Sequence, residues 1–164
     1  MGDVTFAAIY EQYAQDIYRF ALYLSGDTSL AEDLAAETFS RAWVAWDGIR
    51  VGTVKAYLLM ITRNLYRDLL RRRPEVSLDG ASPLTDSAPD PESAAVARSE
   101  LDAVLVALRA LPETERSVLL MATVGGVAYD AIAVAFGITP AAVKVRVHRA
   151  RVKLSAARSA KEQS

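Results

Sequence analysis

Basic side chains recur along the C-terminal part of the chain, where residues 141–164 carry seven bases and one acid. Lys144, His148 and Arg151 are spaced four and three residues apart, so a helix would place them on one face, with Arg146 and Arg149 beside it. The apolar residues of this stretch recur at steps of four, three and four and form another face: Val143, Val147, Ala150 and Leu154. Because ammonium and guanidinium groups bind phosphates and base edges, this helix is a candidate DNA-binding element.

The segment before these cations supplies the turn that would position them. An amphipathic stretch over residues 129–136 stops at Gly137, Thr139 offers an N-cap hydroxyl, and Pro140 stands where a helix tolerates proline. Residues 143–147 read VKVRV and alternate like a strand, but the cap, the proline and the apolar face downstream favour a helix. Two helices joined by such a turn predict a helix-turn-helix, whose second helix enters the major groove of DNA.

A second group of bases lies in residues 55–73, which carry six bases and one acid. Aromatic, hydroxyl and amide side chains are interleaved with them: Tyr57, Thr62, Asn64 and Tyr66. This mixture suits single-stranded nucleic acid, because bases stack on rings while phosphates meet lysine and arginine. It also fits a basic, solvent-exposed helix face with half-buried tyrosines, and the residue types alone leave both interpretations open.

An acidic helix is predicted from about Ser29 to Asp47. Its charged face combines Glu32, Asp33, Glu37 and Arg41. Charges at helical spacing commonly form a solvated surface, and the residues alone favour that interpretation. The aromatic row on a neighbouring face is predicted to lie in the core: Phe39, Trp43 and Trp46.

The other apolar periodicities predict an all-α chain with two small helical domains. One helix is expected over residues 6–24 and ends at Gly26, and another covers residues 54–73 and ends before Pro74. Four prolines within residues 74–91, with no apolar period, indicate a flexible acidic linker.

Beyond the linker, one helix is predicted to begin at Glu92 or Ser93, and another after Leu111, with Pro112 at its first position. The predicted division is a domain over residues 1–73, a linker over 74–98, and a helix-turn-helix domain over 99–164.

The bulk composition excludes several classes of protein. The chain has 164 residues, no cysteine and one histidine, so neither a disulfide framework nor a histidine-based metal cluster is expected. It has no run of about 18 apolar residues and no signal-peptide pattern at its N-terminus, so a cytoplasmic protein without membrane insertion is expected. The net charge of −1 conceals separate acidic and basic blocks, which predict localised rather than bulk contacts with DNA.

Four segments, in this order, resemble the extracytoplasmic-function (ECF) family of RNA polymerase sigma factors, group 4 of the main bacterial sigma family. Residues 33–43, DLAAETFSRAW, are similar to the family's core-binding helix. Residues 57–64, YLLMITRN, with the following Asp68 and three arginines, resemble its promoter-melting helix. Residues 111–120, LPETERSVLL, and 143–151, VKVRVHRAR, resemble its C-terminal helix-turn-helix.

The resemblance implies a function and site residues. The chain would bind core RNA polymerase, through the β′ clamp helices and the β flap, and direct it to promoter DNA without a cofactor, a metal or catalysis. An anti-sigma factor would be a further partner. The residues implied for core docking are Asp33, Leu34, Glu37, Thr38 and Arg41. Those implied for the melted −10 element are Arg50, Val51, Thr53, Lys55, Tyr57, Thr62, Arg63, Tyr66 and Arg67. Those implied for the −35 element are Thr139, Ala141, Lys144, Arg146, His148, Arg149 and Arg151.

The chain departs from the family pattern at Ala131, where glutamate is frequent, and at Ala142 and Val145, where hydroxyl residues are frequent. Hydroxyl contacts of the −35 helix are therefore missing. Two other functions are conceivable: a stand-alone helix-turn-helix regulator that does not bind core polymerase, and an enzyme. The first has no need of the basic, aromatic helix over residues 55–73. The second lacks a metal constellation and a glycine-rich phosphate loop.

Overall fold

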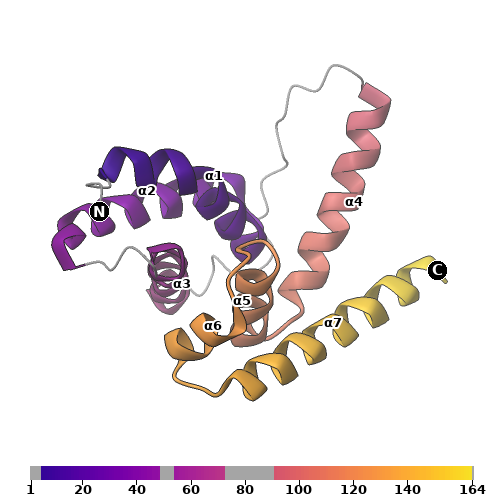
Figure 1. Cartoon of the computed structure of the whole chain (residues 1–164). Coiled ribbons are helices and arrows are strands. Elements are labelled where there is room, and N and C mark those ends of the chain that lie inside the picture. The colour runs from indigo at the N-terminus through magenta and orange to yellow at the C-terminus, as the bar shows by residue number, and fades with distance from the viewer. Residues whose placement is uncertain (1–4, 49–53, 73–90, 164) are drawn as a thin grey trace.

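The computed structural model describes residues 5–48, 54–72 and 91–163, and all regular elements within these ranges are helical, so the prediction of an all-α fold is confirmed (Figure 1). Three helices form a first unit and four form a second. The elements are α1 (Phe6–Ser25), α2 (Thr28–Val44), the 3-10 turn η1 (Trp46–Gly48), α3 (Val54–Arg72), α4 (Pro91–Arg109), α5 (Glu113–Ala122), α6 (Tyr129–Phe136) and α7 (Pro140–Glu162).

A tight junction sets the angle between α1 and α2. Gly26 adopts a left-handed conformation at φ 72° and its N–H donates to the carbonyl of Leu22, which ends α1. Asp27 then caps α2, because its carboxylate accepts the N–H of Leu30 at 3.1 Å. The predicted end of the first helix is therefore confirmed, and the two helices pack directly against each other.

The first unit buries the apolar faces of α1, α2 and α3 against one another. Ile17, Phe20, Leu24 and Leu58 have no solvent exposure. Within this core the hydroxyls of Thr38 and Thr62 lie 2.8 Å apart, and each is also within hydrogen-bond distance of the carbonyl four residues earlier in its helix. Because each hydroxyl has one proton, one of them donates to the other, which donates to its own carbonyl. The polar contact fixes how α2 and α3 are aligned.

The second unit contains the predicted helix-turn-helix, formed by α6 and α7. Gly137 ends α6 in a left-handed conformation, Thr139 caps α7, and Pro140 is its first residue. Residues 143–147 are helical, as the cap and the apolar spacing predicted. The side chains of Val143, Val147 and Ala150 are buried against α5 and α6. Pro112 differs from the prediction, since it is the N-cap residue of α5 and not its first helical residue.

Other predicted features are wrong in detail. Trp43 was expected in the core, but it is 61% exposed, and its ring packs at a steep angle against that of Phe6. The helix predicted to reach Asp47 ends at Val44. Val96 and Val104 are apolar residues of α4, and both are exposed. Residues 91–98, assigned to the linker, belong to α4.

The two units pack against each other, with α5 and α6 between α3 and α7 (Figure 1). Their buried apolar residues form one continuous cluster. Arg109 of α4 donates to the carbonyl of Gly26 at 2.8 Å, so the second unit contacts the end of α1. A Cβ built on Gly26 would lie 2.2 Å from that guanidinium, so a larger residue would displace the Arg109 side chain and would also strain the left-handed backbone. We call this packing of the two units the closed arrangement.

Among the described residues no single helix is both long and apolar enough to cross a membrane; α6 and α7 meet the length and composition criteria only as a pair bent by 101°.

The hydroxyl pair of Thr38 and Thr62 gives a stability prediction. Replacing Thr62 with valine keeps the shape but removes a buried hydroxyl, so the free energy of unfolding should fall by about 1 kcal/mol in a urea titration. Thr123→Val is the control, because its hydroxyl also donates to a carbonyl four residues earlier but belongs to an exposed residue. Equal effects of the two substitutions would contradict a structural role for the buried pair.

Candidate nucleic-acid interface

A groove with a volume of about 470 Å³ lies between α2 and the C-terminal part of α3. Four of the five residues predicted for core docking line it, and we call it the acidic groove: Asp33, Leu34, Glu37 and Arg41. The opposite wall comes from α3 and includes Leu65, Asp68 and Arg72. The lining of the groove therefore combines leucine side chains with charges of both signs.

The charges of the acidic groove are solvated. Arg41 donates to Glu37 at 3.1 Å, and both side chains are more than half exposed. Arg71 and Asp68 form a similar exposed pair on α3. Exposed pairs within one helix contribute little to stability, so these side chains remain available to a partner. Thr38, the fifth predicted docking residue, is fully buried with Thr62 and has no surface to offer in the closed arrangement.

The bases of α3 do not form one open surface. Arg63 has a side chain that is only 7% exposed, because α5 and α6 cover it. Its Nε and Nη2 donate to the two carboxylate oxygens of Glu113 at 2.8 and 3.0 Å. Its guanidinium also stacks over the ring of Phe136, with 4.5 Å from Cζ to the ring centroid. Such a two-point ion pair is among the strongest polar contacts in proteins.

The other predicted residues of this helix have varied surroundings. Arg67 lies 3.6 Å from Glu113 and is about half exposed, and Lys55 pairs with Asp16 of α1 at 3.3 Å. Tyr57 is 37% exposed, whereas Tyr66 is buried beneath Arg116 of α5. Thr62 is buried. The remaining three predicted residues lie outside the described part of the chain: Arg50, Val51 and Thr53.

The cations of α7 present the opposite picture, because they face solvent. Lys144, His148, Arg149 and Arg151 are exposed, and Arg146 is half-buried. Thr139 and Ala141 are also exposed at the start of the helix. The closed arrangement thus leaves the predicted duplex-binding face of α7 open.

Two contacts hold α7 in place behind these cations. The Thr139 hydroxyl accepts the N–H of Ala142 at 3.1 Å and starts the helix. Further along, Lys153 pairs with Glu115 of α5 at 2.8 Å, so this cation is engaged within the second unit.

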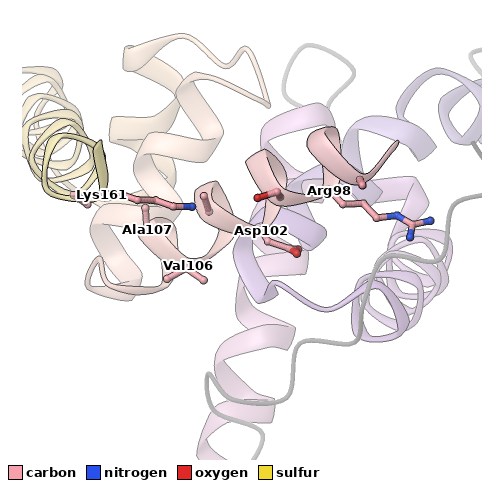
Figure 2. Close-up of a pocket in the computed structure, with 9 residues that line it drawn as sticks. Arg98, Asp102, Val106, Ala107 and Lys161 are labelled. Atoms are coloured by element: carbon pink, nitrogen blue, oxygen red, sulfur yellow. The ribbon is translucent and has the colours of Figure 1, made fainter. Parts of the chain in front are cut away.

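A second groove, of about 680 Å³, separates α4 from the C-terminal part of α7 (Figure 2). Its lining is mostly small and apolar, with Arg98, Asp102 and Lys161 at its edges. Lys161 extends its amine toward α4, whereas the guanidinium of Arg98 points away from α7. None of these residues was predicted to have a function.

The residues that cover Arg63 were not predicted from the sequence. Glu113 follows Pro112 at a predicted helix start, and Phe136 is the last residue of the amphipathic stretch over residues 129–136. Neither pattern carries information about a partner 50 residues away, as in the Arg63–Glu113 hydrogen bonds. Only the folded arrangement brings them together.

Comparisons with known proteins cover both units. Sigma-70 region 2 matches residues 9–74, and Sigma-70, region 4, matches residues 101–154. The ECF RNA polymerase sigma factor SigE of Mycolicibacterium smegmatis is 34% identical over 147 residues, covering 87% of this chain, which spans 57% of that relative's length. The ECF RNA polymerase sigma factor EcfG of Rhodopseudomonas palustris is 37% identical over 140 residues, covering 84% of this chain and 76% of EcfG.

A solved structure is also similar over its whole length. It is the sigma factor RpoE of Bartonella quintana in complex with the anti-sigma factor NepR, with a TM-score of 0.76 and 26% sequence identity. The match covers 94% of this chain and 96% of that one.

The cap of α7 gives a prediction for the cationic face. Thr139→Ala removes the acceptor for the N–H of Ala142, so the free energy of unfolding should fall by about 1 kcal/mol in urea titrations. Thr139→Ser keeps the hydroxyl and should stay close to the parent protein. If alanine and serine give the same stability, the cap does not hold the helix start.

Proposed function

Because the chain belongs to the ECF family of RNA polymerase sigma factors, we propose that it binds core RNA polymerase and directs promoter-specific initiation through −10 and −35 contacts. The observation that carries this proposal is the pairing of two ordered Sigma-70 regions with an open acidic groove on the first and an exposed cationic helix on the second. A stand-alone regulator would need the second of these units but not the first.

Core docking is assigned to the acidic groove. The clamp helices of the polymerase β′ subunit would lie against α2, with Leu34 as the apolar contact and Asp33, Glu37 and Arg41 around it. Charges of both signs at the edge of an apolar contact specify register more than they raise affinity. The groove is open in the closed arrangement, so the free chain can offer it to the polymerase.

The −10 element is assigned to α3 and the residues just before it. Tyr57 is partly exposed and can stack on an unpaired base, while Lys55, Arg63 and Arg67 supply positive charge for phosphates. Turning a base out of the duplex costs a few kcal/mol, which stacking and edge contacts offset.

We assign α7 to the −35 element, which it would contact as duplex DNA. Lys144, Arg146, His148, Arg149 and Arg151 would divide between base edges and phosphates, with the helix start near the backbone. Ala142 and Val145 have no hydroxyl, so the readout at those positions depends on shape and apolar contact.

The proposed protein has no catalysis of its own; the polymerase supplies the chemistry, and we expect it in the cytoplasm, where the polymerase and its promoters are. By analogy with the NepR-bound relative, an anti-sigma factor is a proposed partner.

Charge reversal tests the docking assignment. Asp33→Lys combined with Glu37→Lys should weaken binding to core RNA polymerase by about tenfold or more, because like charges would then meet the partner's surface. Binding can be measured by fluorescence anisotropy of the labelled full chain. The matched control is Glu32→Lys, which reverses an exposed acid of the same helix that does not line the groove. Core affinity that is equally insensitive to both changes would refute the docking assignment.

A second substitution tests the duplex contact. On duplex promoters selected from a promoter pool, Arg149→Ala should reduce transcription about tenfold, since one base-edge contact is worth about 1–3 kcal/mol. The loss should be smaller on templates already melted around −10, which depend less on duplex binding.

Lys153→Ala is the control, because this neighbouring cation of α7 is paired with Glu115. An equal loss for Arg149→Ala on duplex and melted templates would mean that α7 does not read the −35 element.

A further inference from the structure

Of the described residues assigned to melted DNA, Arg63 makes the most side-chain contacts with the second unit. Glu113 accepts two hydrogen bonds from its guanidinium, and Thr114 lies at 3.5 Å from Nη2. Phe136 stacks on the same group. The carboxylate supplies negative charge and the ring supplies a stacking surface, as a phosphate and a base of DNA would.

We propose that Glu113 and Phe136 form an intramolecular latch that occupies Arg63 in place of promoter DNA, so that the free chain is self-inhibited until core polymerase separates the two units. This inference rests on the proposed function, because it takes α3 to be the surface for melted DNA. The latch is defined as Arg63 with Glu113 and Phe136.

The burial of the latch makes it selective for the closed arrangement. The Arg63 and Glu113 side chains are only 7% and 19% exposed, so dissolved salt screens their attraction less than that of surface pairs. Glu113 also accepts a hydrogen bond from Ser117 at 2.7 Å, which fixes its orientation. Arg67 adds a second cation to the same carboxylate at 3.6 Å. One acidic side chain therefore engages two of the bases assigned to the −10 element.

Another feature of the interface favours its opening. Arg116 lies over the ring of Tyr66, is only 4% exposed, and its Nε and Nη1 have no hydrogen-bond partner among the described residues. Donors buried without acceptors destabilise the state that buries them. Separation of α5 from α3 would return these donors to water, which offsets part of the loss of the Arg63–Glu113 pair. The closed arrangement is thus balanced against an open one.

The surfaces that stay exposed in the closed arrangement indicate which binding step comes first. The acidic groove is accessible in the closed arrangement, and so is the cationic face of α7. On α3, by contrast, Arg63 is covered. Core polymerase can therefore dock first, and single-stranded DNA can reach Arg63 only after the units part.

A distance measurement tests the latch in the full chain. The chain has no cysteine, so Ser40→Cys on α2 and Ala156→Cys on α7 provide two unique spin-label sites at exposed positions. Pulsed electron paramagnetic resonance then reports the distance between the units. Glu113→Gln should lower the ratio of closed to open molecules about tenfold, seen as a longer and broader distance distribution.

Glu115→Gln is the matched control, since it makes the same charge change on the same helix but affects a pair within the second unit. A distance distribution of Glu113→Gln identical to that of Glu115→Gln would overturn the proposal. Phe136→Leu tests the latch independently if circular dichroism shows that Glu113→Gln has lost helix; it should also lengthen the distances, and unchanged distances would count against the latch.

Two further measurements test whether the latch controls DNA binding and whether core polymerase opens it. A fluorescent 12-nucleotide single-stranded DNA of mixed sequence should bind Glu113→Gln about tenfold more tightly than Glu115→Gln in the absence of polymerase, and equal binding would overturn the inhibitory role. Core RNA polymerase should lengthen the distances in the parent chain, and distances unchanged in the bound complex would overturn release by docking. Failure of the parent chain to bind core polymerase would instead refute the proposed function, whatever the distances show.

Discussion

A guanidinium group that is taken out of water is stabilised by an anion beside it, and Arg63 has such an anion in a carboxylate from the other half of the chain. The constraint acts in both directions, because Glu113 would also lose its buried partner if the halves parted. Apolar packing brings the two units together in one continuous cluster, but it has little directional preference. The charged pair supplies the direction, and it determines which side of α3 is covered by α5 and α6.

The same side chains that suit nucleic acid also suit an acidic helix start. A basic helix with aromatic neighbours binds phosphates and bases, yet a glutamate and a phenylalanine present closely similar groups. If α3 binds melted DNA as proposed, this likeness keeps Arg63 occupied by protein groups when no polymerase is present. The overall charge of −1 has the same effect over longer distances, since it gives the free chain little general attraction to DNA.

Features coded by neighbouring residues could be predicted from the sequence, and those that depend on distant residues could not. The end of α1 at Gly26 and the start of α7 at Thr139 and Pro140 follow from local backbone and capping chemistry, and both were confirmed. The exposure of Trp43 was not predictable, because whether an aromatic face is covered depends on where other helices lie. The partners of Arg63 could not be predicted for the same reason. For the candidate surfaces, the helices and residue types could be anticipated, whereas the covering of α3 could not.

The contact between Arg109 and Gly26 bears on the first unit by itself. A helix carries partial negative charge at its C-terminal end, which a nearby cation stabilises. The last turn of α1 contains no basic residue, and the guanidinium that meets its terminal carbonyl comes from α4. The helix macrodipole of the first unit is therefore complemented by a residue that lies more than 80 positions later in the chain. When the units separate, α1 loses that counter-charge, so the end of this helix is where the first unit should begin to fray.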